Sequence, residues 1–254
     1  MNKYHEANRK GWDAVSPIWQ AGIEQHGVWH RCHREPELVL RPEERRYLGD
    51  VAGQEICVLG SGDNLVVFAL AGLGARVTSV DISQVQLDTA ARRARELDLD
   101  VRFLRADVTD LSAIPDASFD GVYTGGHVAV WVSDLRRYYA EAGRILRPGG
   151  LFMVNEYHPF RRIWRWGATP LELEASYFVR GPFQTDRSDE VDGAAPGSIP
   201  SYEFHWTVSD YVSAMLAAGC RILALEEMGD GLEEWENAPL EGLPLCLLLV
   251  GRKE

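Results

Sequence analysis

Short apolar runs recur along the middle of the chain at intervals that suit strands alternating with helices. They predict strands at 56–59, 76–80, 101–104, 119–124 and 151–154. Apolar or amphipathic stretches between them predict helices at 65–71, 83–97 and 134–146. Strands and helices that alternate in this way form a parallel sheet covered on both faces, so the pattern indicates a doubly wound α/β fold.

The pattern changes before the first of these strands. Residues 1–48 place aromatic side chains in a polar background, and 42–48 predicts a short helix. Because proline removes a backbone donor from a helix interior, Ser16-Pro17 predicts a break that divides the start of the chain into a helix pair. We therefore expect residues 1–48 to form a helical cap that packs its aromatic side chains on the domain.

The regular alternation also stops after residue 156. Residues 171–177 and 202–206 alternate apolar and polar positions, which predicts two half-buried strands, and the Gly- and Pro-rich stretch 181–200 between them predicts a mobile loop. We interpret 157–206 as a small antiparallel lid; an irregular flap or a dimer contact is the alternative. A helix that begins at Thr207 and strands at 220–225 and 245–250 return the chain to the main domain, which comprises 49–156 and 207–254.

A glycine-rich turn follows the first predicted strand. Gly60 and Gly62 come directly after 56–59, and Asp81 ends the next strand 21 residues after Gly60. Glycine allows a ligand to approach the backbone closely, and a carboxylate at a strand end can accept hydrogen bonds from a ribose diol. A dinucleotide-binding turn needs a third glycine where this chain has Leu65. The turn therefore predicts a nucleoside pocket without a pyrophosphate.

This glycine spacing, together with the turn at Pro148-Gly149-Gly150 before the fifth strand, resembles class I S-adenosylmethionine-dependent methyltransferases. The resemblance implies a Rossmann-like sheet of seven mostly parallel strands with the last strand antiparallel, and S-adenosyl-L-methionine as cofactor. It also implies that Asp107 binds the adenine amino group and that Val108 packs on the ring. The cofactor-binding residues so expected are Gly60, Ser61, Gly62, Asp63, Asn64, Asp81, Ile82, Asp107, Val108 and Thr124.

Methyl transfer from a sulfonium requires mainly that the acceptor atom and the methyl carbon be held in line, so a general base is optional. His127 and His158 follow the fourth and fifth predicted strands, and they are the candidate catalytic residues; a structural or substrate-orienting role is the alternative for each. His205 shares a predicted strand face with Glu203, as an orienting pair or a surface pair.

Arginine and tryptophan alternate at the start of the lid, between 161 and 166. Guanidinium groups beside indole rings favour an anionic aromatic acceptor, whereas a solvated basic turn anchored by its tryptophans is the alternative. The N-terminal aromatics are expected to cover the cofactor mouth, as N-terminal helices often do in the resembled family. The candidate substrate residues are Tyr4, Trp12, Trp19, Tyr157, Arg161, Arg162, His205 and Trp206.

The composition of the chain limits the kinds of molecule that it is expected to bind. A net charge of −12 argues against binding to a nucleic-acid backbone, and no apolar run is long enough for a membrane span. The four cysteines lie far apart and the N-terminus lacks a signal-peptide core, so neither disulfides nor a metal site is expected, and the expected location is cytoplasmic. We expect a small-molecule substrate and a monomer or homodimer.

Two other functions stay open. An NAD(P)-dependent oxidoreductase would share the strand-turn-helix start, but Leu65 and the lack of a Tyr-x-x-x-Lys pair count against it. A catalytically inactive S-adenosylmethionine-binding sensor or partner protein is the second alternative. Val58 and Asn64 keep it open because the resembled family usually has an acidic residue and a glycine at these positions.

Overall fold

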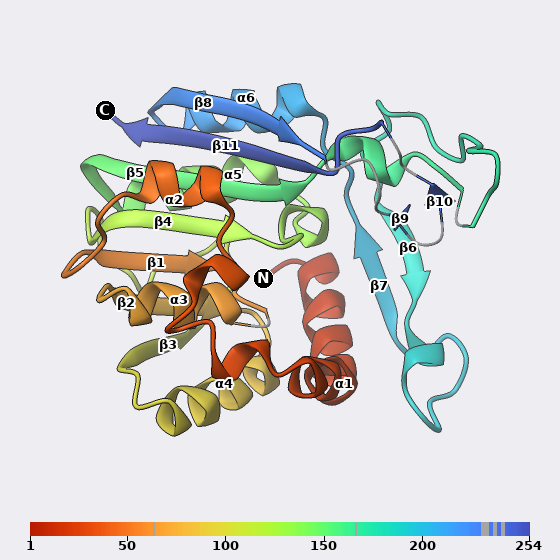
Figure 1. The fold of residues 1–254 in the computed structure, drawn as a ribbon. Helices are drawn as coiled ribbons and strands as arrows, with labels where there is room; N and C mark the ends of the chain where they lie inside the picture. Colours follow the sequence, from red (N-terminus) through yellow and green to blue (C-terminus); the bar gives the residue numbers. More distant parts are fainter. Residues whose placement is uncertain (63, 166, 230–233, 236–237, 240–241) are drawn as a thin grey trace.

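A seven-stranded sheet forms the centre of the computed structural model, which describes residues 1–62, 64–165, 167–229, 234–235, 238–239 and 242–254. The strand order is β3-β2-β1-β4-β5-β11-β8, and β11 runs antiparallel to both of its neighbours (Figure 1). The predicted doubly wound, seven-stranded sheet is confirmed. Its strands are β1 (Glu55–Leu59), β2 (Arg76–Asp81), β3 (Val101–Arg105), β4 (Phe119–Gly125), β5 (Leu146–Tyr157), β8 (Cys220–Met228) and β11 (Cys246–Lys253).

Helices cover both faces of the sheet. One buried cluster joins the sheet to α5 (Leu135–Ile145) and α6 (Val208–Ala217), and a second joins the other face to α3 (Leu65–Gly72) and the end of α4 (Gln84–Glu96). Ser83 caps α4 by accepting from the backbone N–H of Gln86, and Thr207 forms a capping box with Asp210 at the start of α6. The predicted cap Ser133 was wrong, because Asp134 accepts from the backbone N–H of Arg137 and caps α5. No helix among the described residues is both long and apolar enough to cross a bilayer.

The N-terminal segment differs from the prediction. One continuous helix, α1 (Lys3–His26), replaces the expected helix pair and carries Pro17 in its interior. Pro17 lies on the exposed side of α1, where the carbonyl that loses its helical partner can turn to solvent. The prediction of a break at Ser16-Pro17 was therefore wrong, whereas the short helix α2 (Pro42–Leu48) is confirmed.

The segment after β5 also differs. Its strands are β6 (Phe183–Asp186) and β7 (Pro200–Glu203), which pair as an antiparallel hairpin beside α1 (Figure 1). Residues 171–177 form no strand, because within the described part of the chain this stretch has one isolated bridge, from Leu173 to Trp164, and no neighbouring strand to pair with. The predicted strand at 171–177 was wrong, β6 lies inside the predicted loop, and the predicted strand at 202–206 is shifted toward the N-terminus.

The arrowheads of the parallel strands point toward α1 and the β6–β7 hairpin (Figure 1). The carboxyl ends of β1, β2 and β4 therefore meet the two segments that lie outside the central fold. Ligands of open α/β sheets bind at this edge, so the fold itself indicates where the functional site lies.

Candidate functional site

The turn after β1 is shaped for close approach by a ligand. Gly60 and Gly62 both have positive φ values, 64° and 48°, and the backbone N–H groups of Gly60 and Ser61 donate to the carbonyl of Val80. A Cβ on Gly60 would come within 2.5 Å of Val128, so only glycine fits there. At Gly62 the space that a Cβ would fill is open, which leaves a cradle beside the backbone.

Asn64 stands in the left-handed region, with φ of 63°, at the start of α3. Its carboxamide donates to the carbonyl of Gly62 at 2.8 Å and accepts from the Ser79 hydroxyl at 2.9 Å; Ser79 in turn bonds to Ser61. Asparagine tolerates this conformation better than most side chains. Asn64 thus supplies the backbone shape that a glycine would give and braces the turn as well. The predicted neighbour Asp63 lies outside the described residues.

Asp81 ends β2 next to this turn. Its Oδ2 accepts from the backbone N–H of Gly62 at 3.0 Å and its Oδ1 from that of Ser83 at 2.8 Å. Burial raises the pKa of Asp81, while these backbone donors oppose the rise. The carboxylate thus joins β2 to the glycine turn, with Ile82 following it at the strand end. The geometry suits a hydrogen-bond acceptor for a ribose diol.

Asp107 lies in the loop after β3 and is bound by the N-terminal helix. Its Oδ2 is 2.7 Å from Nδ1 of His5, and its Oδ1 accepts from the backbone N–H and the hydroxyl of Thr109. Burial alone would raise the pKa of Asp107, but these hydrogen bonds outweigh it and the pKa is lowered. Val108 is buried beside it. The Thr124 hydroxyl accepts from Tyr138 in the core, so the backbone of Thr124 is what can reach the cofactor edge.

A second group of predicted residues gathers beyond the glycine turn. Val128, which packs on Gly60, is preceded by His127, a half-buried residue with φ of 86°. An N–H of Arg162 faces the ring nitrogens of His127, and Arg162 also lies 3.4 Å from Glu203. Burial, reinforced by the nearby guanidinium, holds the pKa of His127 well below its usual value, so the ring is neutral and accepts from Arg162.

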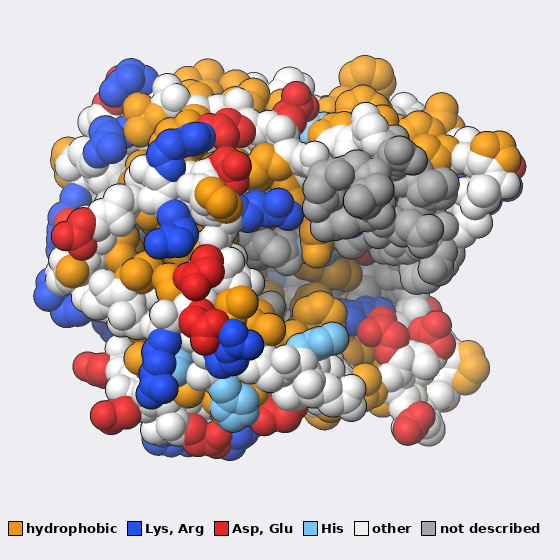
Figure 2. All heavy atoms as spheres, viewed as in Figure 1, with side chains coloured by type: hydrophobic (Ala, Val, Ile, Leu, Met, Phe, Trp, Pro, Cys, Tyr) orange, Lys and Arg blue, Asp and Glu red, His pale blue; other side chains and the backbone are white. Residues whose placement is uncertain are grey.

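We call this space the acceptor chamber; it is lined by His127, Val130, Glu156, Tyr157, Pro159, Arg162, Phe204, His205, Trp206 and Tyr211. Its open volume is about 20 Å³, enough for roughly one water molecule. Figure 2 shows the surrounding surface hollowed between α1 and the β6–β7 hairpin, with apolar side chains in the hollow. Side chains must therefore move before an acceptor enters.

The N-terminal helix closes one side of this region. Asn8 bonds to the backbone N–H and carbonyl of Tyr202 in β7, and also to the carbonyl of Trp131. Trp12 packs edge-on against Trp131, and Tyr4 packs against Tyr202 and Phe204. Tyr4 therefore contacts Phe204 of the chamber wall, and Trp12 lies one layer farther out, behind the Trp131 ring that packs on His127. Trp19 packs on Trp12 but is 46% exposed, on the outer part of the helix.

The other predicted residues separate into two groups. Tyr157, Arg162, His205 and Trp206 line the chamber, and Arg161 lies over the Tyr157 ring. His158 lies apart from it, because its Nε2 is 2.8 Å from Glu227 in β8 and its Nδ1 accepts from the backbone of Phe160. With both ring nitrogens engaged, His158 is placed to hold β5 and β8 together. This geometry favours His127 over His158 as the residue on the substrate side.

Glu156 is a chamber residue that the sequence interpretation missed. The carboxylate follows the apolar centre of β5, is 3% exposed, and accepts from the backbone N–H groups of Val128 and Ala129 at 3.1 and 3.0 Å. Burial raises its pKa to about 7 despite these donors. A lone acidic residue ending an apolar strand was the available signal. Through these two hydrogen bonds Glu156 holds the backbone of the segment that follows His127, and so keeps Val128 packed on Gly60.

The effect of pH provides a test of the buried state of Glu156. With a pKa raised to about 7, the folded protein binds an extra proton between about pH 4.5 and 7, so Glu156 contributes stability at low pH that is lost as pH rises through 7. Relative to Glu156→Gln, the free energy of unfolding of the wild type should fall by roughly 3 kcal/mol between pH 4.5 and 8 in urea titrations.

Glu37→Gln, at an exposed site, is the matched control for this pH experiment and should give a curve parallel to that of the wild type. A Glu156→Gln curve that also runs parallel to the wild type would show that Glu156 keeps an ordinary pKa in the folded protein.

Comparison with known proteins addresses what this edge of the sheet does. Residues 57–154 match the family model for a methyltransferase domain, and they contain the glycine turn, Asp81, Asp107 and His127. Residues 57–154 are therefore similar to the methyltransferase domain of class I S-adenosylmethionine-dependent enzymes. A crystal structure of an S-adenosylmethionine-dependent methyltransferase from Mesorhizobium loti is similar over 84% of this chain and 96% of that one, with a TM-score of 0.64 and 27% identity.

Curated relatives match part of this chain. A demethylmenaquinone methyltransferase from Tropheryma whipplei is 32% identical over 46% of this chain and 47% of its own length. A ubiquinone biosynthesis O-methyltransferase from Xanthomonas oryzae pv. oryzae is 27% identical over 61% of this chain and 59% of its own length. The chain thus spans about half of the curated relatives it matches.

The cofactor of the methyltransferase domain is S-adenosylmethionine, and the residues present fit it. The open cradle at Gly62 admits a ligand against the backbone, and Asp81 offers acceptor oxygens beside it. When bound, the cofactor supplies a methyl group on a positively charged sulfur, which needs no further activation. The chain itself contributes the braced turn, the packing of Val128 on Gly60 and the closure by α1. Among the described residues, no group of three or more His, Cys, Asp or Glu is placed to hold a metal ion.

Proposed function

We propose that this protein transfers the methyl group of S-adenosylmethionine to an O, N or C atom of a small aromatic acceptor that carries an anionic oxygen. The observation that carries the proposal is the acceptor chamber, where Arg162 lies among aromatic side chains directly behind the glycine turn. Val128 joins the two sites, because it packs on Gly60 and its backbone is held by Glu156.

Arg162 is the residue that we expect to hold the acceptor. A guanidinium group stabilises a phenolate or carboxylate oxygen through paired N–H donors, and the adjoining rings of Tyr157 and Trp206 suit a planar acceptor. The names of the two curated relatives, a demethylmenaquinone methyltransferase and an O-methyltransferase of ubiquinone biosynthesis, support an acceptor of this class. Positioning of the acceptor, which supplies most of the rate in such reactions, is the main task of the chamber.

A general base is needed only when the acceptor binds protonated. His205 lies 3.4 Å from Glu203 and stacks on Phe183, so a carboxylate partner orients its ring at the chamber wall. His127 already accepts from Arg162. We therefore propose His205 as the residue that receives a proton, and His127 as part of the wall that positions Arg162.

The acceptor class is tested by S-adenosylhomocysteine release with matched pairs of hydroxybenzoates and the corresponding neutral phenols. Arg162→Gln is expected to lower kcat/KM for the anionic acceptors roughly 10- to 100-fold, the usual effect of losing a charged hydrogen bond. Arg165→Gln is the matched control, because Arg165 is 58% exposed and pairs with Glu172.

If Arg162→Gln lowers kcat/KM equally for anionic and neutral acceptors, Arg162 does not recognise the charge of the acceptor. The proposal of methyl transfer itself would still stand. Tight binding of S-adenosylhomocysteine without transfer to any acceptor in a broad panel would favour the inactive sensor. Binding of NADH in place of S-adenosylhomocysteine would favour the oxidoreductase.

A further inference from the structure

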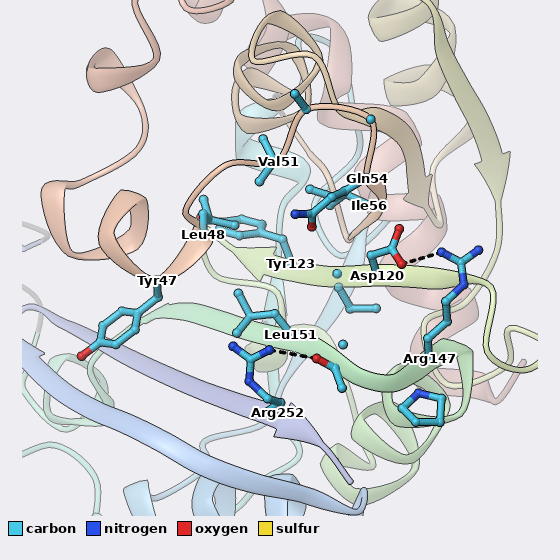
Figure 3. A pocket seen from close by; sticks show the side chains of 17 residues that line it. Tyr47, Leu48, Val51, Gln54, Ile56, Asp120, Tyr123, Arg147, Leu151 and Arg252 are labelled. Carbon is cyan, nitrogen blue, oxygen red and sulfur yellow. Dashed lines mark hydrogen bonds and ion pairs between the residues drawn. The ribbon is translucent and has the colours of Figure 1, made fainter.

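A second cavity lies at the opposite end of the sheet from the glycine turn. Its volume is about 590 Å³, within the range of small-molecule sites, and we call it the amino-edge cavity. Figure 3 shows it between the 47–54 segment and the first residues of β4 and β5. None of its lining residues is part of the cofactor edge or the acceptor chamber.

A missing side chain shapes the floor of this cavity. Ile56, Gly121, Leu151 and Arg252 are successive cross-strand partners on β1, β4, β5 and β11, so they form one row on the sheet face that α3 also covers. Gly121 leaves a gap in the middle of the row. Since neighbouring strands lie about 4.8 Å apart, Ile56 and Leu151 stand roughly 10 Å from each other across this gap.

Two features near the floor keep the gap open. Helix α2 has only seven residues, and the 49–54 segment that follows it contains no helix and lines the cavity. In β5 the partner changes from Leu146 to Leu151 while β4 advances from Phe119 to Gly121, so Pro148-Gly149-Gly150 bulges at the cavity edge. Val51 and Tyr123 complete the apolar wall.

Cationic groups stand at the rim. Arg252 is exposed and donates to the carbonyl of Gly149 at 3.0 Å, and Arg147 pairs with Asp120 at 2.6 Å. Figure 3 places Arg252 beside Leu151 and Gln54 on the opposite side of the cavity. In a protein of net charge −12, a guanidinium next to an apolar slot favours an anion that also carries a flat apolar body.

We propose that the amino-edge cavity is a binding site for a small planar aromatic monoanion, whose ring lies over Gly121 between Ile56 and Leu151 and whose charge pairs with Arg252. The site is separate from methyl transfer, because it lies at the amino ends of the strands. The assignment rests on this cavity alone and not on the identity of the methyl acceptor.

Calorimetric titration of the full chain, with S-adenosylhomocysteine present to fill the cofactor edge, tests the proposal. The probes are naphthalene-1-sulfonate and its neutral counterpart naphthalene-1-sulfonamide. The sulfonate is expected to bind with a Kd of about 1 mM or below, and the sulfonamide about tenfold more weakly. Arg252→Gln should remove this preference for the anion.

Gly121→Val fills the slot and should abolish binding of both probes. The atoms nearest to a Cβ on Gly121 belong to the Ile56 side chain and lie 3.6 Å or more away, which is ordinary contact, so the variant is expected to fold. Arg102→Gln on the distant strand β3 and Asp81→Ala at the cofactor edge are the controls, and both should bind the sulfonate as the wild type does.

Equal affinity for the sulfonate in wild type, Arg252→Gln and Gly121→Val would overturn the proposal, as would displacement of the sulfonate by S-adenosylhomocysteine. A concentration-dependent dimer in sedimentation velocity that Gly121→Val abolishes would show that a second copy of the chain occupies the cavity, and would also overturn it. Methyl transfer is measured in Gly121→Val as well. If the variant retains it, a failure of the cavity proposal is distinguished from a failure of the proposed function.

Discussion

Replacing Gly60 by alanine is expected to destabilise the protein by roughly 2–4 kcal/mol and to abolish measurable binding of S-adenosylhomocysteine. The new Cβ would come within 2.5 Å of Val128 and would force a side-chain-bearing residue to a φ of 64°. Urea unfolding gives the loss of stability, and calorimetry gives the loss of binding. Relief of the overlap would push Val128 and the His127 segment away from the turn.

Two variants separate the steric effect from backbone strain. Gly27→Ala places alanine at nearly the same φ, 66°, where no atom lies within 4 Å, so it should cost only about 1–2 kcal/mol. Val128→Ala in the Gly60→Ala background should restore part of the stability and binding. If Gly60→Ala costs no more than Gly27→Ala, the packing of Val128 on the turn does not constrain the site.

Asp81→Ala is expected to weaken S-adenosylhomocysteine binding by roughly 10- to 100-fold in calorimetric titrations. The carboxylate has two tasks here, because it accepts from Gly62 and Ser83 and offers its remaining lone pairs to the ribose. Asp81→Asn retains one acceptor oxygen and should bind with intermediate affinity. The effect should appear in KM for S-adenosylmethionine as well.

The matched control for Asp81 is Asp88→Ala, which removes an exposed carboxylate of α4 that accepts a hydrogen bond from Gln84. Its affinity for S-adenosylhomocysteine should equal that of the wild type. Unchanged affinity in Asp81→Ala would mean that the ribose is held elsewhere along the cofactor edge.

The central fold could be predicted because its signals are local. The strand at 56–59, the glycine turn and the capping residue Ser83 each determine nearby backbone geometry, and the structure has all three. Regular alternation of strands and helices then leaves few topologies. The order of the final strands came from the family resemblance rather than from the residues themselves.

The peripheral segments depend on partners that are distant in the sequence. Residues 171–177 alternate well, yet they lack a neighbouring strand, whereas Phe183–Asp186 becomes a strand because β7 pairs with it. The continuity of α1 through Pro17 likewise depends on tertiary contacts, such as the buried hydrogen bond from Arg93 to Gln20. Local propensity cannot reveal such contacts.

The candidate site divides in the same way. Asp81 and the glycines were found from spacing, whereas Glu156 was missed because its importance comes from backbone donors of another loop. His158 was placed at the correct edge of the sheet, but its ring is held by Glu227, which is 69 residues away in sequence. Sequence spacing identifies the strand end and not the direction in which its side chain points.

The contacts of α1 also constrain how the protein is made. This helix leaves the ribosome before the segments that it contacts, because its Asn8 bonds to Tyr202, 194 residues later, and its His5 bonds to Asp107. During synthesis the helix therefore lacks these contacts while the first strands assemble, since a long loop must close before the contacts form. The cofactor edge is covered only after Tyr202 has been synthesised, so a growing chain that has already formed its glycine turn still has that edge open to solvent.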